Sequence, residues 1–173
     1  ELVASYAAQT GLVQPAQRPK SGIQKKNAPE DNIKRVQRLL ITWITDEPKL
    51  YHKIKKYISA GDFTEDLYKV VADKLFTSLE EGNYNPAAII SSFADEEEQR
   101  EAAALFNTKL EALETEQDRE KAFHDILYAV KKNSFDYYSA KLGSDVEALN
   151  KVIEGKKALE ELGKTHISID EGQ

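Results

Sequence analysis

The last third of the chain contains two apolar helical patterns separated by a short turn, and this arrangement constrains the fold more than any other feature. From Glu116 to Leu142, large apolar residues recur at helical spacing, which predicts one long helix with an apolar face. Gly143, Ser144 and Asp145 predict a turn, and a second helical pattern follows from Val146 to Gly163. Two helices joined by so short a turn predict an antiparallel helical hairpin.

Both arms of this hairpin carry apolar residues outside a single stripe. On the first arm, Tyr128 and Phe135 lie seven residues apart and away from the main apolar face. The second arm has one apolar side at Val146, Leu149 and Ile153 and a neighbouring one at Val152, Leu159 and Leu162. Two helices cannot cover so wide an apolar surface by themselves. Ordinary core packing is one explanation of these residues, and a docking surface for another protein is the alternative.

The preceding part of the chain predicts five shorter helices. Their starts are marked by proline or by capping residues at Pro29, Asp46, Thr64, Asn85 and Asp95, and Thr115 caps the long helix. The apolar side of the helix that starts at Asp95 continues to Leu113, and Asn133-Ser134 is the expected place for a break or bend in the long helix. No segment has a convincing strand pattern. The sequence therefore predicts an all-α protein, a compact helical bundle followed by a long helix and a C-terminal helical hairpin.

Composition divides the chain into four parts. Residues 1–13 predict one short helix, and residues 14–29 are a basic linker rich in proline, glutamine and lysine with few large apolar side chains. The expected helical bundle covers residues 30–133, and the hairpin covers residues 134–173. Because the chain begins at Glu1 and contains no methionine, we expect it to be part of a longer protein.

Charge and composition limit the partners and the compartment. Residues 1–38 contain seven Lys and Arg residues and three acidic residues, whereas the whole chain has a net charge of -6. The remaining body is therefore strongly acidic, and we expect little direct binding of nucleic acid by it. Cysteine is absent, which leaves the compartment open but fits a reducing interior. No apolar run is long enough to span a membrane.

Motifs for catalysis and metal binding are missing from the sequence. The three histidines, His52, His124 and His166, are not in a metal-ligand pattern, and the glycines do not form a phosphate-binding loop. The acidic run from Asp95 to Glu98 suits a solvated first turn of a helix better than a metal site, because consecutive helical positions point in different directions. A carboxylate metal site in the bundle would need Glu-x-x-His pairs, which the sequence lacks. We therefore expect no catalytic residue, no metal ligand and no cofactor in this chain.

A series of segments along residues 30–170 resembles the C-terminal domain of bacterial DnaG-type DNA primases, the part that binds the replicative helicase. The segments occur in the same order and are patterns of helices and side chains rather than a catalytic signature. They are Arg38-Leu-Leu-Ile-Thr-Trp-Ile, Tyr51-His-Lys-Ile-Lys-Lys-Tyr-Ile-Ser, Asp62-Phe-Thr, Asn85-Pro-Ala-Ala-Ile-Ile, Glu96-Glu-Glu-Gln-Arg-Glu-Ala-Ala-Ala-Leu-Phe-Asn, Lys157-Ala-Leu-Glu-Glu-Leu and His166-Ile-Ser. One departure is Gly163-Lys164-Thr165, which places a glycine that can stop a helix shortly before His166.

The resemblance implies a function and a place in a parent chain. A primase of this type has a zinc-binding domain and a magnesium-dependent polymerase core before this domain, so residues 1–13 would be the trailing end of the core and residues 14–29 the tether. The partner would be the hexameric DnaB-type helicase at the bacterial replication fork, gripped mainly by the hairpin, while the bundle modulates helicase activity. The isolated domain would be a monomer without enzymatic activity.

The expected helicase-binding residues all lie on the hairpin or directly after it. They are Tyr128, Phe135, Leu142, Leu149, Val152, Ile153, Lys156, Leu159, Leu162 and Ile167. Two alternatives remain open at this stage. The chain could be the N-terminal collar domain of the helicase itself, which is similar to the bundle and would self-associate, or a generic helical protein-interaction domain.

Overall fold

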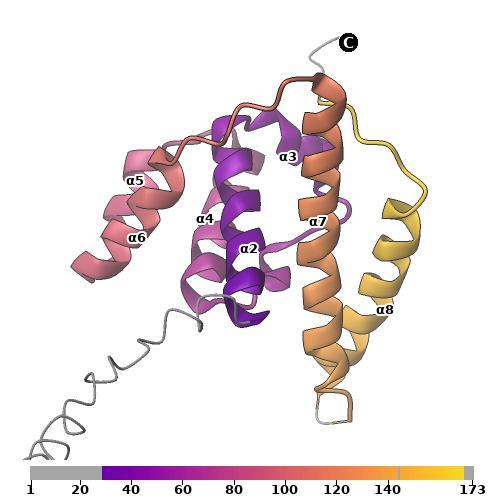
Figure 1. The fold of residues 1–173 in the computed structure, drawn as a ribbon. Coiled ribbons are helices and arrows are strands. Elements are labelled where there is room, and N and C mark those ends of the chain that lie inside the picture. The colour runs from indigo at the N-terminus through magenta and orange to yellow at the C-terminus, as the bar shows by residue number, and fades with distance from the viewer. Residues whose placement is uncertain (1–28, 144, 170–173) are drawn as a thin grey trace, which may run out of the picture. The chain divides into compact units, whose positions relative to one another are not determined.

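The computed structural model describes residues 29–143 and 145–169, and all regular secondary structure in these ranges is helical (Figure 1). This confirms the expected all-α fold with a bundle, a long helix and a hairpin. The segment at 1–13 and almost all of the linker at 14–29 lie outside the described residues. No helix in the described ranges is long and apolar enough to cross a membrane. The elements are α2 (Pro29–Asp46), α3 (Lys49–Ile54), the short 3-10 helix η2 (Ala60–Asp62), α4 (Asp66–Glu81), α5 (Pro86–Ser91), α6 (Glu96–Asn107), α7 (Glu116–Ser139) and α8 (Val146–Leu162).

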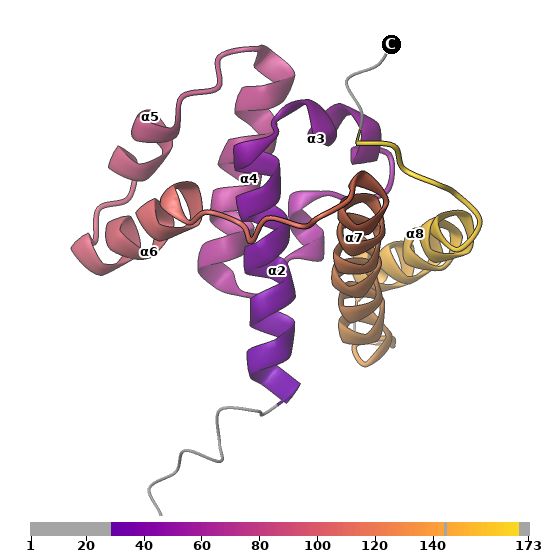
Figure 2. The same ribbon diagram turned by 45° about the horizontal axis from the view of Figure 1, so that its top comes forward.

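One buried cluster joins the bundle to the long helix α7. Leu40 and Ile44 on α2 and Leu75 on α4 are fully buried in it, and Phe123 enters it from α7. The rings of Trp43 and Phe123 meet edge to face, with 5.2 Å between their centroids. Helices α5 and α6 pack against α4 on the side away from α7, as both ribbon views show (Figures 1 and 2). The core thus lies between the bundle helices and one face of α7.

Helices α7 and α8 run antiparallel along each other and form the expected hairpin (Figure 1). Gly143 in the connecting turn has φ +98°, a conformation that glycine adopts without steric penalty. The expected break at Asn133-Ser134 is absent, because α7 is continuous from Glu116 to Ser139. Ser134 is buried there and its hydroxyl donates to Asp62 at 2.7 Å, so this weak helix former is held by a tertiary contact. The division between bundle and hairpin at residues 133 and 134 stays a prediction, and the described residues from 32 to 169 belong to one compact unit.

Small residues on α8 allow the two hairpin helices to approach closely. Ala148, Gly155 and Ala158 are buried, and their spacing places them on the face of α8 that meets α7. A Cβ atom added at Gly155 would lie 3.2 Å from Cδ2 of Phe135. The ring of Phe135 therefore occupies the space that any larger residue at position 155 would need.

Most expected helix boundaries agree with the structure. The side chains of Asn85, Asp95 and Thr115 each accept hydrogen bonds from the first turn of the helix that follows. Gly82 ends α4 in the left-handed conformation with φ +71°. Thr64 differs from the expectation. Its hydroxyl accepts a hydrogen bond from Gln37 at 2.7 Å, and α4 begins only at Asp66.

Two helices are shorter than their sequence patterns predict. Asp46 is the last residue of α2 rather than the cap of the next helix, and the short α3 follows Pro48 and ends at Ile54. Helix α6 ends at Asn107 and does not reach Leu113. The Thr108 backbone is extended there, and its hydroxyl donates to the carbonyl of Ala104. The apolar residues after Thr108 therefore come from an irregular segment.

The close contact at Gly155 predicts a large effect of a bulky residue. Gly155→Val should lower the free energy of unfolding by about 1–3 kcal/mol, because its methyl groups would overlap the ring of Phe135. Lys156→Val places the same side chain on the adjacent, exposed position of α8 and should change stability by no more than about 0.5 kcal/mol. Urea unfolding followed by circular dichroism measures both. Equal midpoints for the two variants would contradict the close approach of the helices.

Candidate interaction surface

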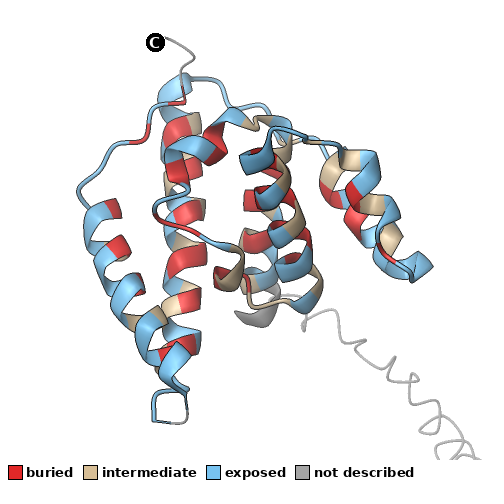
Figure 3. Cartoon of the chain, turned by 180° about the vertical axis from the view of Figure 1, so that it is seen from behind, coloured by how far each residue is buried: buried red, intermediate tan, exposed pale blue. Residues whose placement is uncertain are grey.

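The outer face of α8 carries branched apolar side chains that the described part of the chain does not cover. Val146 is 75% exposed, Leu149 49% and Ile153 59%. Their spacing of three and four residues places them on one face, opposite to Gly155 and the face that meets α7. Figure 3 shows exposed residues along the outer side of α8 and buried ones along the side turned to α7. Helix α8 therefore has two apolar faces, and only the one with small residues is used inside the hairpin.

Leu142 extends this surface to the end of the hairpin. It is 47% exposed and lies directly before the turn that leads into α8. We call Leu142, Val146, Leu149 and Ile153 the tip stripe. The turn lies at the end of the hairpin away from α3 and from the last described residues (Figure 1). Of the eight large hydrophobic side chains that are exposed in the described residues, six belong to the hairpin, so exposure of this kind is concentrated there. Such a concentration is typical of an interaction site.

The tip stripe has charged neighbours on both sides along α8. Asp145 lies between Leu142 and Val146 of the stripe, and its side chain caps α8 by accepting a hydrogen bond from the backbone N–H of Glu147 at 2.9 Å. Exposed Lys156 and Lys157 follow the stripe in the next turn. Exposed Glu147 and Glu154 also lie along this part of α8, so charged groups of both signs border the apolar side chains. Among the described residues, no group of histidine and carboxylate side chains is arranged to hold a metal ion.

The C-terminal segment after α8 packs against the core and α7 at the end of the hairpin opposite to the turn. Ile167 and Ile169 are each only 6% exposed and belong to the core cluster. The backbone N–H of Ile169 donates to Glu120 Oε1 at 3.1 Å, and His166 Nε2 lies 2.7 Å from Glu120 Oε2. His166 therefore has an acidic partner on α7, which its position in the sequence did not indicate.

Two further contacts bind this segment to its surroundings. The amino group of Lys53 donates to the carbonyl of Ser168 at 2.6 Å, and the ring N–H of His124 donates to the carbonyl of Leu162 over the same distance. The end of α8 is thus tied to α3 and α7. The tip stripe lies toward the other end of the hairpin, where Gly143 is in the connecting turn.

The structure divides the expected helicase-binding residues into three groups. Tyr128, Leu142, Leu149, Ile153 and Lys156 are exposed, and Tyr128 stacks on His124 with 6.4 Å between ring centroids. Three residues are half-buried, namely Phe135, Val152 and Leu159. Leu162 is fully buried and Ile167 is 6% exposed.

The burial of Leu162 and Ile167 corrects the expectation for these two residues. Leu162 turns toward α7 at the end of α8, and Ile167 is held in the core by the C-terminal segment. The uncovered apolar face includes three of the expected residues, Leu142, Leu149 and Ile153. It contains Val146, which is the most exposed of all these residues and was not among the expected partner contacts. The spacing of Ala148, Gly155 and Ala158 in the sequence was the signal that could have located the face turned to α7.

This division between core and surface predicts opposite effects of two similar substitutions on α8. Leu162→Ala removes a fully buried side chain and should lower the free energy of unfolding by about 2–5 kcal/mol. Ile153→Ala removes an exposed one and should change it by no more than about 0.5 kcal/mol. Thermal unfolding of the two variants beside the unchanged chain gives the comparison. A loss of stability in Ile153→Ala as large as in Leu162→Ala would mean that the stripe is covered.

No family model, no curated protein and no solved structure matches this chain. The role of the tip stripe is accordingly inferred from the contacts of the hairpin and from the side chains that it leaves exposed.

Proposed function

We propose that residues 30–169 are the helicase-docking domain of a bacterial DnaG-type primase. The observation that supports this most strongly is the tip stripe, an apolar surface on the outer face of α8 with no cover from the described residues. In this role the domain binds rather than catalyses. It needs no cofactor of its own, whereas zinc and magnesium would serve other domains of the parent primase. It would work at the replication fork in the bacterial cytoplasm.

The arrangement of the hairpin suits docking. Its base is fixed by the core and by the C-terminal segment, so that a partner at the tip binds a surface that is already ordered. Preorganisation of this kind reduces the entropy lost on binding. Leu149 and Ile153 lie at the centre of the tip stripe and are the expected energetic anchors, since a few central side chains carry most of the binding energy of an interface.

Attachment to a hexamer explains how a small surface can be sufficient. A stable interface buries about 1,600 Å² in total, and four exposed side chains supply only part of that. If several primases bind one helicase hexamer, each docking domain has a higher effective concentration near its binding site, although the interface itself is no larger. Primer synthesis would then stay close to the moving helicase.

Substitution at the centre of the tip stripe tests the proposal. Ile153→Asp should weaken binding of the domain to the hexameric helicase of the same bacterium at least about tenfold, because a carboxylate would have to be desolvated in an apolar contact. Val70→Asp is the matched control. Val70 is also exposed, at 43%, but lies on α4 in the bundle. Its substitution should leave the affinity unchanged. Isothermal titration calorimetry measures both affinities, and circular dichroism checks that both variants remain helical.

The outcome also separates the alternatives. Absence of any complex between the unchanged domain and the helicase would contradict the proposal. Equal losses of affinity in Ile153→Asp and Val70→Asp would contradict the assignment of the tip stripe. If the stripe instead joins two copies of this chain, as the collar domain of a helicase would require, light scattering should show a dimer or larger species that Ile153→Asp converts to monomers.

A further inference from the structure

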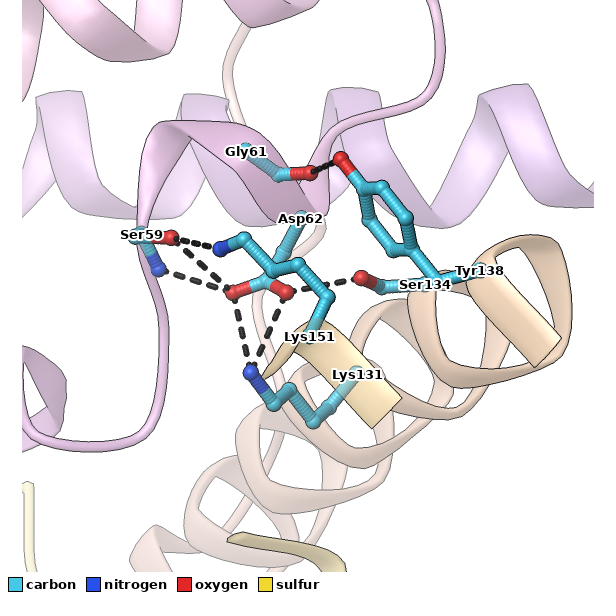
Figure 4. Close-up of polar contacts among 7 residues, drawn as sticks. All are labelled: Ser59, Gly61, Asp62, Lys131, Ser134, Tyr138 and Lys151. Atoms are coloured by element: carbon cyan, nitrogen blue, oxygen red, sulfur yellow. Dashed lines mark hydrogen bonds and ion pairs between the residues drawn. The ribbon is translucent and has the colours of Figure 1, made fainter. Parts of the chain in front are cut away.

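A buried ion pair connects the hairpin to the bundle. Asp62 at the end of η2 is 1% exposed, and the side chain of Lys131 on α7 is 5% exposed. The amino group of Lys131 donates to both carboxylate oxygens of Asp62 at 3.1 Å (Figure 4). These two residues are 69 positions apart in the sequence, and nothing in the local pattern of either one indicated the contact.

The carboxylate of Asp62 has further donors on both sides. Ser134, one turn after Lys131 on α7, donates its hydroxyl to Oδ1 at 2.7 Å. The backbone N–H of Ser59 donates to Oδ2 at 2.8 Å. Each oxygen therefore accepts from Lys131 and from at least one other group. A buried charge is tolerated in a protein interior only with such complete pairing.

Two more contacts bring both arms of the hairpin onto the same short turn (Figure 4). The hydroxyl of Tyr138 on α7 donates to the carbonyl of Gly61 at 2.9 Å, and the amino group of Lys151 on α8 donates to the hydroxyl of Ser59 at the same distance. Burial, together with the nearby carboxylates of Glu147 and Asp62, raises the pKa of Tyr138. The hydroxyl of Tyr138 therefore remains protonated and can donate.

The geometry restricts how α7 can lie on the bundle. A slide of α7 by one residue moves Lys131 by about 1.5 Å along the helix axis and turns it by about a quarter of a circle. Asp62 and Lys131 would then be buried without each other, which is strongly unfavourable. A displaced apolar side chain loses packing contacts, but it leaves no buried charge without a partner. The ion pair thus penalises other positions of the hairpin more than it stabilises this one.

We propose that Asp62 and Lys131, with Ser134, form an orientation latch that holds the hairpin at one angle and in one register on the bundle. The latch is a property of the domain itself, with or without a partner at the tip stripe. Neutralising it leaves a folded domain in which the hairpin takes more than one position.

Distance measurements between spin labels test the latch. The chain has no cysteine, so the exposed pair Asn150→Cys on α8 and Asp73→Cys on α4 can be labelled selectively. With the latch intact, double electron–electron resonance should give one narrow distance distribution. Lys131→Met removes the cation and keeps the length of the side chain, and it should give a broader distribution or a second distance.

Lys132→Met is the matched control for the loss of a lysine from α7. Lys132 is exposed and pairs at 2.7 Å with Asp136 on its own helix, so the distance distribution should stay as it is with the latch intact. If Lys131→Met alone does not fold, the double variant with Asp62→Asn and Lys131→Met removes both charges. It should fold and give the broader distance distribution. An unchanged single distance in a folded latch variant, or the same broadening in Lys132→Met, would overturn the proposal.

Discussion

The close approach of α8 to α7 at Gly155 is the constraint on which the rest of the structure depends. Because the contact is made by Ala148, Gly155 and Ala158, the hairpin is held by small residues and by the ring of Phe135 that fills the space over Gly155. The branched residues of α8 are then forced to the opposite side. An exposed apolar stripe follows directly from the way in which the hairpin closes, since one helix cannot turn two opposite faces to the same neighbour.

The two ends of the hairpin have different physical roles. The base is anchored by apolar burial of Phe123 and Ile167 and by the C-terminal segment on Glu120. Farther along α7, the buried pair of Asp62 with Lys131 connects the hairpin to the bundle. Toward the tip, Tyr138 and Lys151 contact Gly61 and Ser59 of the bundle, while the outer face of α8 stays uncovered by the described residues. A partner at the tip stripe would therefore bind a surface that is held in place relative to the bundle. This links the proposed docking role to the proposed latch, although each rests on separate contacts.

The sequence indicated the fold well and the surface only partly. Periodicity and capping residues predicted the order of the helices, because both signals depend on local interactions. Asn85, Asp95 and Thr115, for example, cap the helices that directly follow them. The predicted helix breaks were wrong where a tertiary contact determines the structure. Ser134, for example, is kept in α7 by its hydrogen bond to Asp62. The expected partner contacts took residues from both apolar sides of α8, the exposed Leu149 and Ile153 as well as the buried Leu162, because side-chain size was not weighed. A row of large apolar residues looks like a core, but here the glycine and the alanines face the neighbouring helix.

The most direct measurement of the central claim is photo-crosslinking from the tip stripe. With Leu149 replaced by benzoylphenylalanine, irradiation in the presence of the hexameric helicase should join the domain to the helicase. The same probe at Val70, which is exposed on α4, should give no such product. Crosslinks from position 149 to the domain's own chain would show that the stripe is already covered. Equal yields from positions 149 and 70 would show that the helicase does not distinguish the tip stripe from the rest of the surface.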